Sequence, residues 1–75
     1  PMITKLIAIL LMFNGEMVLK EYPFTGDVME CLEYGDQLRL ELSEYKELGL
    51  RGLANEQGWY LNDGRGTWHG VICSK

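Results

Sequence analysis

Residues 6–19 read LIAILLMFNGEMVL, in which the pair Asn14-Gly15 separates two apolar runs. Asn-Gly between apolar runs is a strong signal for a β-hairpin, because both residues tolerate the positive φ angles that a type I′ turn requires. We therefore predict a hairpin that turns at Asn14-Gly15. A turn of two residues fixes the pairing register, and it places Leu10 opposite Leu19.

The first run, residues 6–13, is apolar at every position. Because successive side chains of a strand point to opposite faces, this strand is predicted to be central and buried on both faces. The second face of this strand must then be covered, and a second copy of the chain is a candidate for covering it. Lys5 followed by an apolar run also resembles a signal peptide, but no small-x-small cleavage site follows, which favours the strand. Pro1 before Met2 is interpreted as the remnant of a cleaved tag.

A helix is predicted from about Val28 to about Leu48. Asp27 is a typical N-cap, and Glu30 three residues later completes a capping-box pattern. Gly49 is a natural C-terminal cap. A glycine within the helix indicates either close approach to the sheet or a break in the helix. The residues expected on the buried face, at spacings of three and four, are Val28, Cys31, Leu32, Gly35, Leu38, Leu42 and Tyr45.

The C-terminal third alternates between turn residues and short apolar segments. Residues 62–66 have the composition of a turn. Residues 67–73 are predicted to be the final strand, with 59–61 pairing to it as a short hairpin. A short helical turn over 50–57 is expected, although the pattern leaves 50–61 open between helix and strand. The sequence thus predicts a single α+β domain, residues 1–75, with an antiparallel sheet (the N-terminal hairpin plus a C-terminal strand or hairpin) packed against one helix.

Length and charge restrict the function. A domain of 75 residues buries only about 60% of the surface that its unfolded chain exposes, so a disulfide, a metal or a partner chain would help to stabilise it. The formal net charge of −4 argues against nucleic-acid binding, which usually requires a basic surface. The sequence has no apolar run of 18 residues, so we expect no transmembrane helix and no membrane partner.

Cys31 and Cys73 are the only two cysteines. Cys31 lies on the predicted buried face of the helix and Cys73 ends the last strand. If that strand lies beneath the helix, the two residues come within bonding distance, and a bridge would stabilise the domain by about 4 kcal/mol. The alternative is two reduced thiols, as expected in a reducing cytoplasm.

His69, Cys73 and Cys31 suggest a metal site or a thiol enzyme, but the pattern argues against both. Four residues along a strand span about 13 Å, whereas zinc ligands lie about 2 Å from the ion, so only a bulge near Gly70 would bring His69 and Cys73 together. A thiol nucleophile must be exposed and activated, whereas Cys31 is predicted to be buried. We therefore predict no catalytic residue, no metal site and no cofactor, and a protein that is not an enzyme.

The aromatic residues of the C-terminal third are the best candidates for a binding surface, because Trp, Tyr and Arg are enriched at interface hot spots. Leu40 supports the same interpretation, because it lies near the polar side of the predicted helix. The candidate interface residues are Trp59, Tyr60, Arg65, Trp68 and Leu40.

Three short stretches, LIAILLMFNGEMV (6–18), MECL (29–32) and VIC (71–73), together resemble small uncharacterised proteins of tailed phages of marine bacteria, especially cyanophages. Those proteins open with an apolar strand and an Asn-Gly-Glu turn, and they carry a Cys-Leu pair on a helix and a cysteine in the last strand. The resemblance covers about half of the chain. It implies a viral origin and no activity.

The leading prediction is a small acidic protein-binding module in the cytoplasm, the host cytoplasm if the chain is viral. Its expected partners are a host protein and a second copy of the chain as a homodimer. Two alternatives stay open. One is a structural or secreted domain held by the Cys31–Cys73 bridge, and the other, less favoured, is a small metal-binding or thiol enzyme.

Overall fold

The computed structural model describes residues 2–47 and 57–75. In these residues the chain forms an antiparallel sheet and one helix, which confirms the predicted α+β class. The N-terminal hairpin, the helix and the C-terminal hairpin occur in the predicted order, with one additional strand between them. The elements are β1 (Ile3–Met12), β2 (Met17–Gly26), α1 (Val28–Leu42), β3 (Ser43–Lys46), β4 (Gly58–Leu61) and β5 (Gly66–Ser74).

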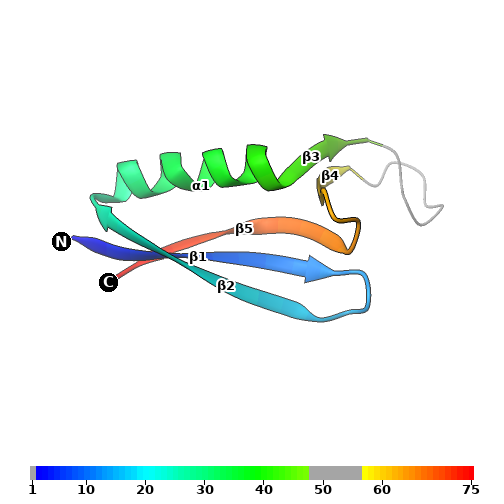
Figure 1. The fold of residues 1–75 in the computed structure, drawn as a ribbon, viewed down its shortest axis with the longest axis horizontal. Helices are drawn as coiled ribbons and strands as arrows, with labels where there is room; N and C mark the ends of the chain where they lie inside the picture. Colours follow the sequence, from blue (N-terminus) through cyan, green and yellow to red (C-terminus); the bar gives the residue numbers. More distant parts are fainter. Residues whose placement is uncertain (1, 48–56) are drawn as a thin grey trace.

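The strands lie in the order β2-β1-β5-β4-β3, so β1 is the central strand of a three-stranded unit with β2 and β5. Figure 1 shows α1 over one face of this unit, with β3 continuing from the end of the helix. The two ends of the chain lie together, where Lys5 pairs with Ser74. The central position of β1 agrees with the prediction from its unbroken apolar run.

The register of the first hairpin differs from the prediction by one residue. Leu10 pairs with Val18, not with Leu19, and Leu11 pairs with Met17. The connection is a longer loop than predicted. In this loop the N–H of Gly15 donates to the carbonyl of Met12 at 3.0 Å, a typical hydrogen-bond distance. Gly15 has a positive φ of 94°, as in hairpin loops that place a glycine in the left-handed region. The shift exchanges the two faces of β2 relative to β1.

The helix begins where the sequence predicts. The N–H of Glu30 donates to Asp27 Oδ1 (2.8 Å), and the N–H of Asp27 donates to Glu30 Oε1 (3.1 Å), which completes the capping box. Gly35 is explained by close approach and not by a helix break. A Cβ at this position would lie 3.1 Å from a methyl group of Val71.

The helix ends at Leu42, earlier than the predicted Leu48. Ser43 is extended, and its N–H donates to the carbonyl of Arg39, closing the last turn. Residues 43–46, which we expected to be helical, form β3 and pair with β4, with Tyr45 opposite Trp59. The predicted cap Gly49 and most of the predicted helical turn at 50–57 lie outside the described residues.

The core lies between α1 and the sheet. Leu6, Ala8 and Cys31 are fully buried, and Ile3, Leu38 and Trp68 are nearly so. The buried face of the helix is narrower than predicted, since Cys31, Gly35 and Leu38 are its buried residues, whereas Val28, Leu32 and Leu42 are exposed. The C-terminal hairpin of residues 59–61 with the last strand is confirmed by the pairing of Tyr60 with Thr67.

Candidate functional site

Cys31 and Cys73 form a disulfide in the structure, which is one of the two alternatives that the sequence leaves open. The Cα atoms are 6.2 Å apart and the S–S distance is 2.06 Å. Cys31 is buried on α1, and Cys73 pairs with Leu6 across the strands, so the bridge joins the helix directly to the centre of the sheet. This arrangement is compatible with a disulfide-stabilised domain.

The face of the sheet opposite α1 is apolar and is not covered by any described residue. Because Leu6 and Ala8 of β1 point into the core, the alternate residues Ile7, Ile9 and Leu11 point away from the helix. Their partners on the neighbouring strands share that face. We call this surface the outer face and define it by Ile7, Ile9, Leu11, Met17, Leu19 and Ile72.

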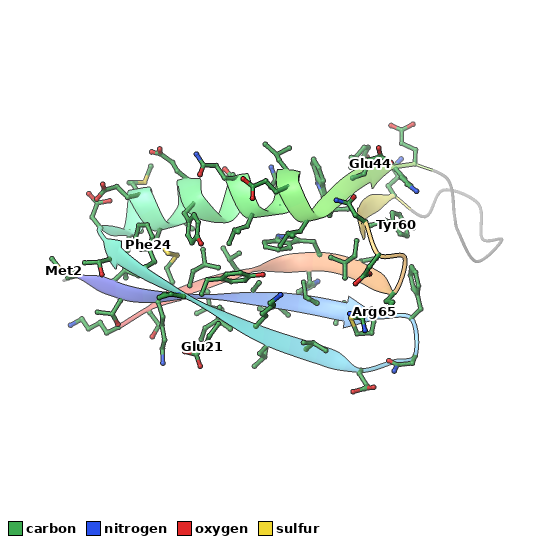
Figure 2. All side chains as sticks on the ribbon, viewed as in Figure 1. Met2, Glu21, Phe24, Glu44, Tyr60 and Arg65 are labelled. Atoms are coloured by element: carbon green, nitrogen blue, oxygen red, sulfur yellow. A yellow bond between two sulfur atoms is a disulfide. The ribbon has the colours of Figure 1, made fainter. Side chains whose placement is uncertain are left out.

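The side strands carry the most exposed residues of the outer face. Met17 is 62% exposed, Leu19 59% and Ile72 46%. Lys5 and Glu21 lie at one end, with Lys5 Nζ 4.0 Å from Glu21 Oε1. Figure 2 shows Glu21 pointing away from the helix, whereas Phe24 of the same strand points toward it. The outer face thus has an apolar centre, and one pair of opposite charges lies at one of its ends.

The aromatic residues proposed from sequence as a binding surface are mostly part of the core. Tyr60 is 4% exposed and Trp68 is 8% exposed. Trp59 is half-buried, and the Arg39 guanidinium lies 4.5 Å from the centre of its ring. Because Tyr60 and Trp68 are buried, the aromatic side chains do not form an exposed patch in this structure.

The other two candidate interface residues are exposed and lie on different elements. Leu40 is 62% exposed, on α1. Arg65 lies on the β4–β5 turn (Figure 2), where its N–H and its Nε donate to the two oxygens of Asp63, each at 3.0 Å. These hydrogen bonds, first the one from the Arg65 N–H, hold the pKa of Asp63 below its ordinary value. The turn is therefore ordered by a local ion pair.

His69 occupies a bulge in β5, since Ile9 pairs with Gly70 and Leu10 with Trp68. The structure thus contains the irregularity near Gly70 that a His69–Cys73 metal site would require. Both cysteine sulfurs are in the bridge, however, and His69 is exposed. Across residues 2–47 and 57–75, no group of three or more His, Cys, Asp or Glu side chains is placed to hold a metal ion.

The residues of the outer face were not predicted correctly, because the predicted register of the first hairpin was wrong by one residue. It placed Met17 and Leu19 on the same face as Leu10, whereas the structure places them with Ile9 and Leu11. No signal in the sequence separates the two arrangements, because a loop of three residues that includes Phe13 fits as well as the two-residue turn at Asn14-Gly15.

No family model, no curated protein and no solved structure matches this chain. In the described part of the chain, no helix has both the length and the apolar character needed to cross a membrane.

Proposed function

We propose that this chain is a non-enzymatic protein-binding module and that the outer face is its docking surface. The observation that carries the proposal is the row of apolar side chains on the uncovered face of β1, β2 and β5. A contiguous apolar surface in contact with water is unfavourable, and on folded proteins such surfaces commonly mark interaction sites. A one-residue change in register would have placed Met17 and Leu19 toward the helix, so the observed pairing is what creates this surface.

The occupant that we propose is a second copy of the chain. Each copy has a formal charge of −4, which opposes self-association through most surfaces. The outer face is different, because the six residues that define it are uncharged and the charges of Lys5 and Glu21 at one end balance each other. A basic partner would be attracted to the acidic parts of the surface, whereas a neutral apolar face suits a copy of itself.

The size of the outer face predicts a weak dimer. Three strands of nine or ten residues, at about 4.8 Å between strands and about 3.3 Å per residue, give a face of roughly 400 Å². Stable interfaces bury about 800 Å² on each partner. We therefore expect association that depends strongly on concentration.

Sedimentation equilibrium over protein concentrations up to about 1 mM tests the proposal, because this range detects association as weak as about −4 kcal/mol. The variants are Leu19→Lys on the outer face and Leu40→Lys on α1. Leu19 and Leu40 are matched controls, since they are 59% and 62% exposed. We expect the natural chain and Leu40→Lys to form dimers and Leu19→Lys to remain monomeric. A monomeric natural chain, or a dimer lost in Leu40→Lys and kept in Leu19→Lys, would contradict the proposal.

The resemblance to small phage proteins supports a further part of the proposal, in which the module acts on a protein of the infected host. A purified host protein that binds the natural chain at defined stoichiometry would support it. If that binding were unchanged in Leu19→Lys, the host protein would be using a different surface.

The bridge favours a second candidate, a disulfide-stabilised structural or secreted domain. Disulfides persist in oxidising compartments and are rare in reducing cytoplasm, so the Cys31–Cys73 bond favours this candidate over the cytoplasmic location expected from sequence. Mass spectrometry of protein alkylated directly in intact cells measures the state of the thiols. Two alkyl groups per chain would support the cytoplasmic module, and none would support the secreted domain.

A further inference from the structure

A pocket of about 420 Å³ opens on the side of the sheet that faces the helix, between the turn end of β1–β2 and the β4–β5 turn. Its volume is in the range of small-molecule sites. Val18, Leu10 and Trp68 are neighbours across β2, β1 and β5 and form its apolar floor, and Leu61 adds to the apolar lining. The pocket is on the opposite side of the sheet from the outer face, because Leu10 and Val18 pair on the core side.

Lys20 is an exposed cation in the lining of this pocket. It pairs with Ala8 across β1 and β2, and its Nζ lies 5.4 Å from the ring centre of Tyr22. Among the residues that the structure describes, no carboxylate lies within salt-bridge distance of Lys20 Nζ. Because Lys20 is exposed, its alkyl stem can lie along the apolar lining while its ammonium group stays in contact with water.

Arg65 and Asp63 complete the polar side of the pocket. Arg65 Nε is 3.0 Å from Asp63 Oδ2, so these two charges satisfy each other. With Lys20 the polar side has two cations and one carboxylate, which leaves one net positive charge. This local charge is opposite in sign to that of the whole protein, which is −4. An apolar pocket whose charged residues sum to one positive charge is complementary to an anion that has an apolar body.

We propose that this pocket binds a small organic carboxylate, with the apolar body between Trp68 and Val18 and the carboxylate at Lys20 Nζ. The site is independent of the outer face and adds a small-molecule ligand to the proposed protein-binding function.

Titration of the full chain, labelled with ¹⁵N, with decanoate below its micelle concentration tests the proposal by amide chemical shifts. Decanol is the uncharged comparison, because it has the same chain without the carboxylate. Lys20→Glu removes the cation at the pocket. Lys75→Glu is its control, because it makes the same change in net charge at an exposed residue remote from the pocket lining.

We expect saturable shifts at Val18, Lys20 and Leu61, with decanoate bound more tightly than decanol. Lys20→Glu should weaken decanoate binding by about tenfold, and Lys75→Glu should leave it unchanged. The Leu19→Lys variant should still bind decanoate, which separates this site from the dimer surface. Equal binding of decanol, equal weakening by the two lysine variants, shifts centred on the outer face, or no saturable binding would each overturn the proposal.

Discussion

At Gly66 the backbone of β5 passes so close to β1 that no side chain fits between them. A Cβ at this position would collide with the carbonyl oxygen of Leu11 and would lie 2.7 Å from the Cα of Met12. Gly66 is buried and pairs with Met12 at the end of the β1–β5 ladder. Because the obstacle is backbone and not a flexible side chain, the strands must move apart to accept even one methyl group.

Gly66→Ala is therefore expected to lower the free energy of unfolding by about 2 kcal/mol or more. Gly70→Ala is the matched control in the same strand, since a Cβ there meets nothing within 4 Å, and it should change stability by less than about 0.5 kcal/mol. Urea unfolding followed by circular dichroism gives both values. Equal effects of the two substitutions would show that β5 does not approach β1 in this way.

Among the elements, those that depend on local chemistry were predictable and those that depend on distant pairing were not. The capping box of Asp27 and Glu30 lies within four residues, and the structure contains it as predicted. The predicted end of α1 was wrong, because Leu42 and Tyr45 continue the helical spacing of apolar residues beyond the true end of the helix. There the pairing of β3 with β4, 12 or more residues away along the chain, overrides that local preference.

The first hairpin illustrates the same limit. The turn residues locate the loop, but a loop of two or of three residues fits the same letters, and each places the opposite side of β2 in the core. The length of this loop determines which residues form the outer face and which line the pocket, so neither set of residues was predictable. The disulfide was predictable as one alternative, because it needed only the final strand to lie beneath the helix.

The capping box gives a prediction for α1. Asp27→Ala removes the acceptor of the Glu30 N–H, which is 2.8 Å from Asp27 Oδ1, and should cost about 1 kcal/mol of stability. Asp27→Asn keeps a side-chain acceptor at the cap and should cost much less. Thermal unfolding of the two variants makes the comparison. An equal loss in both would indicate that the charge of Asp27, and not its hydrogen bond, stabilises the helix start.

At the scale of the whole molecule, the bridge holds the helix on a sheet whose other face is not covered by any residue that the structure describes. It joins residues that are 42 positions apart in sequence. A domain of this size has a small core, in which Leu6 and Cys31 are the largest fully buried side chains, so a cross-link contributes a large part of its stability.

Replacing both cysteines by alanine should therefore lower the free energy of unfolding by about 4 kcal/mol on the chain-entropy account. Reduction of the natural chain should produce a similar loss, whereas the double variant should be insensitive to reductant. Guanidinium unfolding with and without reductant measures these differences. If reductant left the natural chain unchanged, the bridge would be absent in solution.

The central claim is that the outer face of the sheet binds the same face of another copy. Isotope-filtered nuclear Overhauser spectroscopy on a mixture of labelled and unlabelled chains tests it most directly, because it detects protons that are close together in different copies. We predict intermolecular contacts among the methyl groups of Ile7, Ile9, Leu19 and Ile72. Intermolecular contacts from the methyl groups of α1 instead, or none at concentrations up to about 1 mM, would contradict the claim.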